Sequence, residues 1–238
     1  MTNETNIPAL DARLSTALDF VRPGAVVADI GTDHAYLPAA LVLSGRAVSA
    51  IAADINPGPL VHAAETVAKY GLADRITLRE TDGLHGLEGM GVTDILIFGM
   101  GGELIARIID EAPLACSSGI RLILQPMTKH AELRNWLCSH GFAIRGERLS
   151  QAAGKIYQTI CAGYTGKNTA LSPLEAELGP CNLTEGSALL CDLMAHKIKV
   201  LTARLDGRRS VGLPDGEDGE MLAAMQAWLK QNREEGRT

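Results

Sequence analysis

Short and nearly continuous apolar runs alternate along this chain with segments whose apolar residues recur at helical spacing. The strand-like runs lie near residues 25–30, 48–53, 75–80, 92–98 and 119–124. The helix-like segments between them span residues 36–44, 58–70, 101–110 and 129–139. Runs that are apolar throughout are typical of parallel strands covered on both faces. The alternation therefore predicts an α/β fold with a doubly wound sheet.

The two ends of this region follow other patterns. Apolar residues between Leu10 and Val21 recur at helical spacing and predict an amphipathic first helix. Near residue 140 the pattern changes, because the strand-like runs Phe142–Leu149 and Lys155–Tyr164 are separated only by the short segment Ser150–Gly154. A parallel pair needs a connection of a dozen or more residues, so these runs should pair antiparallel. A sheet of seven strands with an antiparallel last strand resembles the class I S-adenosylmethionine-dependent methyltransferases more than the nicotinamide dehydrogenases.

Beyond Thr165 the composition changes. A linker rich in Gly and Pro is expected first, and apolar residues at helical spacing follow between Leu190 and Leu205 and between Met221 and Leu229. These two segments predict an antiparallel helical hairpin. We expect two domains, with residues 1–165 forming the catalytic domain and residues 166–238 forming the hairpin.

Charge and composition restrict the possible partners. The 238 residues carry a net charge of −6, so the whole molecule should repel a polyphosphate and only a local basic patch would bind RNA. The candidate RNA-binding cations are Arg13, Arg134, Lys155, Lys197 and Arg204. Five cysteines without a CxxC pair predict neither disulfides nor a metal site. With no long apolar run and no leader, the chain is expected to be a cytoplasmic monomer without membrane contact.

Acidic residues and glycines follow the first three predicted strands. Asp29 and Gly31 end the first strand, and the turn that follows offers free backbone N–H groups to a carboxylate. Asp54 ends the second strand, where a carboxylate accepts hydrogen bonds from a ribose diol. Asp82 follows the third strand, where it would accept from an adenine amino group while Leu84 packs on the base. The predicted cofactor contacts are Asp29, Gly31, Thr32, Asp33, His34, Ala35, Asp54, Ile55, Asp82, Gly83, Leu84, Gly99 and Met100.

Five motifs in order, DIGTDHAYLP, DINPGPL, DGL, GMGG and LQP, make the chain similar to the bacterial tRNA (adenine(22)-N(1))-methyltransferase family. This resemblance implies S-adenosyl-L-methionine as cofactor, an adenosine in the D-arm region of tRNA as acceptor, and a helical hairpin that assists tRNA binding. Met127 departs from the family's pattern, which carries Asn after the Gln-Pro pair, and this weakens any acceptor role at that position.

The expected reaction needs alignment more than proton removal, because adenine N1 attacks the methyl group through a lone pair. Asp33 is the preferred catalytic carboxylate, with a capping role as its alternative. The carbonyl of Gly99 is a second acceptor for the adenine N6 amino group, and Tyr36 would stack on or hydrogen-bond the base. A methyltransferase for another RNA or a small molecule, and a noncatalytic RNA-binding protein with the same fold, remain as alternative functions.

Overall fold

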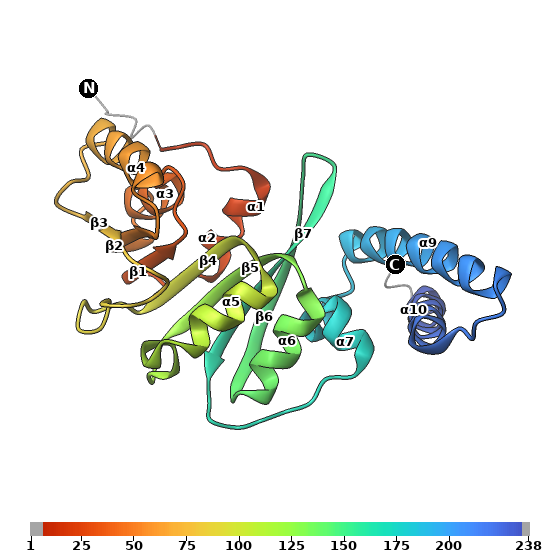
Figure 1. Ribbon diagram of the computed structural model, residues 1–238. Coiled ribbons are helices and arrows are strands. Elements are labelled where there is room, and N and C mark those ends of the chain that lie inside the picture. The colour runs from red at the N-terminus through yellow and green to blue at the C-terminus, as the bar shows by residue number, and fades with distance from the viewer. Residues whose placement is uncertain (1–6, 235–238) are drawn as a thin grey trace. The chain divides into compact units, whose positions relative to one another are not determined.

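The structure is a computed structural model that describes residues 7–234 (Figure 1). Two compact units divide the chain after Thr169, and each is described by itself below. The first unit is built on a sheet of seven strands in the order β3-β2-β1-β4-β5-β7-β6. The strands are β1 (Ala25–Ile30), β2 (Ala47–Asp54), β3 (Ile76–Glu80), β4 (Asp94–Gly101), β5 (Arg121–Thr128), β6 (Phe142–Ala152) and β7 (Lys155–Tyr164).

The pairing of the strands confirms the predicted fold class. Strands β1 to β5 pair in parallel, whereas β7 lies antiparallel to both β5 and β6. The turn between β6 and β7 has positive φ at Ala153 and Gly154, which closes a tight hairpin. The short segment between these two strands therefore joins an antiparallel pair, as its length predicted.

Helices cover both faces of the sheet and close two apolar cores. One core lies under α5 (Gly102–Asp110) and α6 (His130–Ser139). The other lies under α3 (Tyr36–Leu43) and α4 (Pro57–Lys69), together with the N-terminal residues. Consecutive residues of β4 alternate between the two cores, so Ile95 and Ile97 face one and Leu96 and Phe98 face the other. Burial on both faces explains why the strand sequences are apolar throughout.

The prediction of one continuous N-terminal helix was wrong. The segment forms two single-turn helices, α1 (Ala12–Ser15) and α2 (Ala17–Phe20), which meet at Thr16. The Thr16 hydroxyl lies 2.7 Å from the carbonyl oxygen of Arg13 and 2.8 Å from the Thr159 hydroxyl on β7. A threonine side chain that bonds the backbone in this way competes with regular helical hydrogen bonding.

Strands β4 and β5 run further than their apolar runs predicted. Strand β4 continues through the GMGG motif to Gly101, and its pairing with β5 shifts register at Met100. Gly99 at this irregularity has a φ of +79°, a value that favours glycine. Such bulges re-aim side chains and are frequent beside active sites. The bulge lies at the carboxyl end of β4, next to the end of β1.

The second unit holds the predicted helical pair, α9 (Ala188–Ser210) and α10 (Gly216–Glu234), which pack against each other. The predicted linker contains two further helices, α7 (Pro173–Leu178) and α8 (Pro180–Glu185). Ser172 and Glu175 form a reciprocal capping box, and both helices begin with proline at a position where its missing N–H costs nothing. Within residues 7–234, every helix is too short or too polar to cross a membrane.

Candidate functional site

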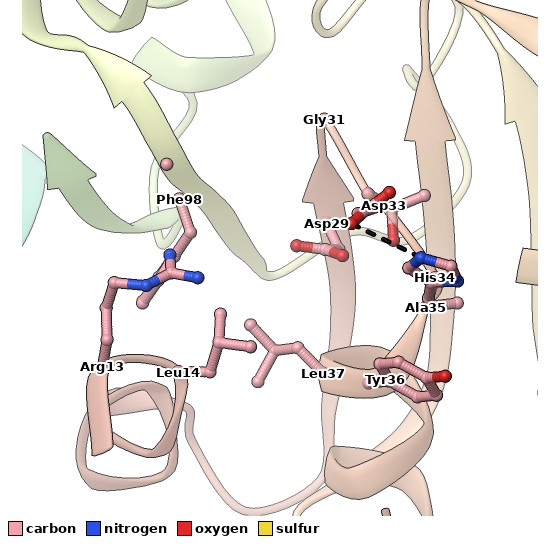
Figure 2. A pocket seen from close by; sticks show the side chains of 12 residues that line it. Arg13, Leu14, Asp29, Gly31, Asp33, His34, Ala35, Tyr36, Leu37 and Phe98 are labelled. Atoms are coloured by element: carbon pink, nitrogen blue, oxygen red, sulfur yellow. Dashed lines mark ion pairs between the residues drawn. The ribbon is translucent and has the colours of Figure 1, made fainter. Parts of the chain in front are cut away.

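A pocket of about 290 Å³ lies at the carboxyl ends of β1 and β4. Here the chain changes direction across the sheet, because β1 continues through β2 and β3 on one side and meets β4 on the other. Ligands of open α/β sheets bind in the crevice at this point. The turn after β1 forms one side of the pocket, and Arg13, Leu14 and Phe98 form the other (Figure 2).

Eight of the predicted site residues that follow the first and fourth strands line this pocket together. They are Asp29, Gly31, Thr32, Asp33, His34, Ala35, Tyr36 and Gly99. Arg13, a predicted RNA contact, is also part of the lining.

The turn after β1 needs a glycine at its first position. Gly31 has a φ of +75°, and a Cβ atom added there would lie 2.2 Å from the Cε of Met100. The N–H groups of Gly31 and Thr32 both donate to the carbonyl oxygen of Ala53, at 2.8 and 2.9 Å, which ties the turn to β2. Ala35 has a φ of +53° just before α3 begins. The turn is thus tied to β2, and a side chain at Gly31 would displace that of Met100.

Asp29 and Thr32 place unusual polar groups in this turn. The Asp29 side chain belongs to a residue only 6% exposed, and burial raises the pKa of its carboxyl group to about 6. Interaction with the Thr32 hydroxyl lowers the pKa of Asp29 in part. This hydroxyl makes no hydrogen bond of ordinary geometry within the described residues. A buried acid and an unpartnered hydroxyl fit a ligand that brings polar and positively charged groups. The amino acid part of S-adenosylmethionine has such groups.

Asp33, His34 and Tyr36 form the exposed side of the turn. The Asp33 carboxylate is 82% exposed and lies 3.6 Å from the Nε2 of His34. The N-cap position of α3 is occupied by Ala35, which makes no side-chain cap hydrogen bond, and Asp33 lies two positions before it. The His34 ring stacks on Tyr36 with centroids 5.3 Å apart and also contacts His62, at 4.8 Å. The rings of His34 and Tyr36 line the pocket on the side of the turn (Figure 2), and Tyr36 is 44% exposed.

The predicted contacts after β2 and β3 lie outside the pocket lining. Asp54 accepts a hydrogen bond of 2.7 Å from the N–H of Asn56, and Asp82 is exposed after β3. Ile55 is 57% exposed, so it presents an apolar surface to solvent at the end of β2. Because β1, β2 and β3 are parallel neighbours, all three of their carboxyl ends meet one edge of the sheet.

Three predicted cofactor contacts take part in packing within the protein. Leu84 is 1% exposed within the apolar core, so the expectation that its side chain packs on a base needs correction. At Gly83, an added Cβ would lie 3.2 Å from Ile108, which explains the glycine by close packing. The Met100 side chain fills the space beside Gly31.

The predicted RNA contacts occupy different environments. Arg134 needs correction, because it is 0% exposed and pairs at 2.7 Å with the buried Glu147 while donating to Gln158. This guanidinium holds α6 to the hairpin and offers no surface to a phosphate. Lys155 is exposed at the start of β7. Lys197 and Arg204 of α9 pair with Glu177 and Asp218, which reduces the positive charge that they present.

Sequence reasoning missed the role of Gln125. This residue of β5 is 0% exposed, and its Oε1 accepts from the guanidinium of Arg13 at 3.0 Å and from the N–H of Gly99 at 3.3 Å. The only available signal was a polar amide directly after the apolar run of residues 122–124. Within residues 7–234, no cluster of three or more His, Cys, Asp or Glu side chains is arranged to hold a metal ion.

Comparison with known proteins supports one family. A methyltransferase domain model matches residues 10–160. The Bacillus subtilis tRNA (adenine(22)-N(1))-methyltransferase is 37% identical over 202 residues, which cover 85% of this chain and 84% of that protein. Streptococcus pneumoniae Sp1610 in complex with S-adenosyl-L-methionine has 34% identity and a TM-score of 0.82, covering 93% of this chain and 100% of that chain. M. capricolum TrmK in complex with S-adenosyl-homocysteine has 26% identity and a TM-score of 0.73, covering 94% of this chain and 96% of that chain. The chain belongs to the tRNA (adenine(22)-N(1))-methyltransferase family.

Proposed function

We propose that this protein transfers a methyl group from S-adenosyl-L-methionine to N1 of an adenosine at position 22 of bacterial tRNA. The observation that carries the proposal is the pocket at the β1–β4 junction, where the buried Asp29 and the unpartnered Thr32 fit a charged amino acid group. A relative with the same activity in its name covers most of the chain. The protein is proposed to act in the cytoplasm as a monomer, with residues 1–165 as the catalytic domain.

The proposed cofactor site extends from the pocket along the edge of the sheet. Asp29 and the turn Gly31–Ala35 would hold the methionine part, and Asp54 would accept hydrogen bonds from the ribose hydroxyls. Ile55 would pack on the adenine, and Asp82 would accept from the adenine amino group. Bound there, the cofactor supplies an electrophilic methyl group on a positively charged sulfur.

The protein's own part in the reaction is to orient and stabilise the acceptor adenine. N1 has a lone pair and no proton to lose, so a general base is not required. Methylation leaves the adenine positively charged, and a carboxylate that accepts from N6 favours that charge. Asp33 is proposed for this role because its carboxylate is exposed at the pocket and because Ala35, not Asp33, occupies the N-cap of α3. The carbonyl of Gly99 is the second candidate acceptor, and Tyr36 offers a ring for stacking.

Two measurements on the wild-type protein test the function. Addition of S-adenosylmethionine should raise the thermal midpoint, since a ligand that binds only the folded state stabilises it. Mass analysis of tRNA nucleosides after incubation should show 1-methyladenosine at position 22. Methylation of another RNA or of a small molecule would contradict the substrate, and a thermal midpoint that does not move would contradict the enzyme.

The role of Asp33 is tested by Asp33→Ala with Glu65→Ala as a matched control. Glu65 is also an exposed carboxylate close to a histidine, 3.7 Å from His62, but it lies outside the pocket. We expect Asp33→Ala to lower kcat by roughly a hundredfold, because it removes charge stabilisation of the transition state. The control should keep the wild-type rate. Unchanged turnover in Asp33→Ala would exclude a catalytic role.

A further inference from the structure

Arg13 enters the pocket from α1, on the side opposite the turn that holds Asp33 and Tyr36 (Figure 2). Its guanidinium donates to Gln125 at 3.0 Å and lies 5.9 Å from the ring centroid of Tyr157 on β7. The amide group and the ring come from different strands, so they restrain the guanidinium from two directions. A long and flexible side chain is thereby held in one place.

The buried amide of Gln125 forms the hydrogen bond that holds Arg13. It is fully buried in β5 directly after the apolar residues 122–124, and a buried amide is retained only where its hydrogen bonds are satisfied. Its oxygen accepts from both Arg13 and the N–H of Gly99, and its nitrogen donates to the carbonyl of Pro126 at 2.8 Å. One side-chain oxygen therefore connects α1, the bulge of β4 and β5 at the pocket.

The guanidinium of Arg13 retains capacity to bind a ligand. Within the described residues it forms a long ion pair with Asp11, whose carboxylate is 3.8 Å from Nε and beyond hydrogen-bond distance. Gln125 is its hydrogen-bond acceptor, so the other N–H groups of the guanidinium are available. The Arg13 side chain is 22% exposed, which leaves it accessible from the pocket.

The charge of Arg13 indicates which ligand group it would take. The proposed reaction brings a positively charged sulfur to an adenine that becomes positive, so a guanidinium against the reacting atoms would oppose it. A phosphate is different, because the planar fork of arginine binds phosphate oxygens in pairs. A flipped adenosine carries a backbone phosphate beside its base and ribose.

We propose that Gln125 is a positioning residue that holds Arg13 in the pocket, where its guanidinium binds the backbone phosphate next to the target adenosine. This inference rests on the proposed function, since it takes tRNA as the substrate. It assigns the phosphate contact to a side chain fixed inside the catalytic pocket, in a protein whose net charge is −6.

Arg13→Ala, Gln125→Met and the double variant test the inference, with Arg107→Ala as the control. Arg107 is an exposed arginine of α5 that pairs with Glu111 at 4.0 Å and lies outside this pocket. We measure tRNA affinity over a range of salt concentrations, KM and kcat for tRNA, and S-adenosylmethionine affinity.

We expect Arg13→Ala to weaken tRNA binding and raise KM roughly tenfold, with kcat and cofactor affinity within about twofold of wild type. The slope of log affinity against log salt should fall by about one, as for the loss of one phosphate contact. Gln125→Met should weaken tRNA binding in the wild-type background and add nothing in the Arg13→Ala background, because it acts through Arg13.

Two results would overturn the inference. One is an unchanged salt slope in Arg13→Ala, and the other is an equal effect of Gln125→Met with and without Arg13. Where Gln125→Met lowers the thermal midpoint or abolishes cofactor binding, Gln125→Glu replaces it. This variant keeps an oxygen that accepts from Arg13, loses the donor to Pro126 and offsets the charge of the guanidinium, so its tRNA defect should also require Arg13. A wild-type protein that binds tRNA without methylating it would refute the proposed function and leave the Arg13 measurement valid.

Discussion

The two sides of the pocket are built from different kinds of contact. The β1 side consists of Asp29 and the turn 31–36, which is one continuous segment of chain. The β4 side consists of Phe98, Gly99 and Arg13 with Gln125 behind it, and Arg13 and Gln125 are 112 positions apart in the sequence. One side therefore depends on local backbone conformation, whereas the other exists only once distant segments have come together.

This difference corresponds to two kinds of recognition. The β1 side presents a buried acid and an unpartnered hydroxyl on a turn that two backbone hydrogen bonds tie to β2, which suits a small cofactor of constant shape. The β4 side presents a long cationic side chain restrained by a hydrogen bond and a ring contact, which suits a phosphate of a large and flexible RNA. Substitutions on each side should therefore change different affinities.

The largest effect is expected at Gly31. Gly31→Ala places a Cβ at positive φ and 2.2 Å from the terminal methyl of Met100, which must move aside, so we expect a loss of roughly 1 to 2 kcal/mol in stability and at least a tenfold loss in S-adenosylmethionine affinity. Gly24→Ala is the matched control, because Gly24 has a φ of +77° and no atom within 4 Å of an added Cβ. Thermal unfolding and calorimetry measure both variants. Equal losses of stability and of cofactor affinity in the two variants would show that the contact with Met100 has no role.

A pH-dependent effect is expected from Asp29. Burial raises the pKa of its carboxyl from 3.8 to about 6 in the folded state, so the folded protein binds this proton more tightly than the unfolded chain does. The resulting stabilisation is complete below about pH 4 and is lost as the pH rises through about 6. Relative to Asp29→Asn, wild type should lose roughly 2 to 3 kcal/mol of stability between these limits.

Urea unfolding of the ligand-free protein at pH 4.5 and 7.5 measures this difference. Asp29→Asn should also bind S-adenosylmethionine more weakly at pH 7.5, since it lacks the negative charge, although its ligand-free form is the more stable one. Asp29 would then lower the stability of the ligand-free protein while it strengthens cofactor binding. A difference in stability that does not change between the two pH values would contradict the assignment to Asp29.

The smallest effect is expected from Thr32→Val, which removes the unpartnered hydroxyl at nearly constant volume. Stability should stay within about 1 kcal/mol of wild type, and cofactor affinity should fall about three- to tenfold. Thr16→Val is the contrasting variant, because that buried hydroxyl contacts Arg13 and Thr159 and its loss should cost about 1 to 2 kcal/mol. A Thr32→Val protein with wild-type cofactor affinity would remove Thr32 from the site.

Much of the fold could be predicted from local patterns. The strands, the covering helices and the antiparallel last pair follow from apolar runs, helical spacing and the length of one connection. The single N-terminal helix was wrong because Thr16 bonds to a residue 143 positions away, which no helical periodicity reveals. The helices α7 and α8 were missed because their prolines read as linker residues, although the same prolines begin helices when a cap precedes them.

The candidate site divides in the same way. The motif DIGTDHAY and the glycines of GMGG were recognisable, because a turn that needs positive φ and an acid at a strand end are properties of a few adjacent residues. Arg134 and Arg13 both lie in helical segments, and the residues next to them in the sequence do not show which of the two is buried. One pairs with Glu147 in the interior and the other enters the pocket.

The amino acid sequence by itself determined the order along the chain of the strands and of the helices that cover the sheet, and it indicated the turn after β1, since backbone hydrogen bonding and φ preferences act over a few residues. Only the tertiary structure decided that Leu84 and Arg134 belong to the interior and that Gln125 holds Arg13 at the pocket. The burial and partners of a side chain depend on which distant segments lie against it, and that is settled when the sheet and its helices pack together.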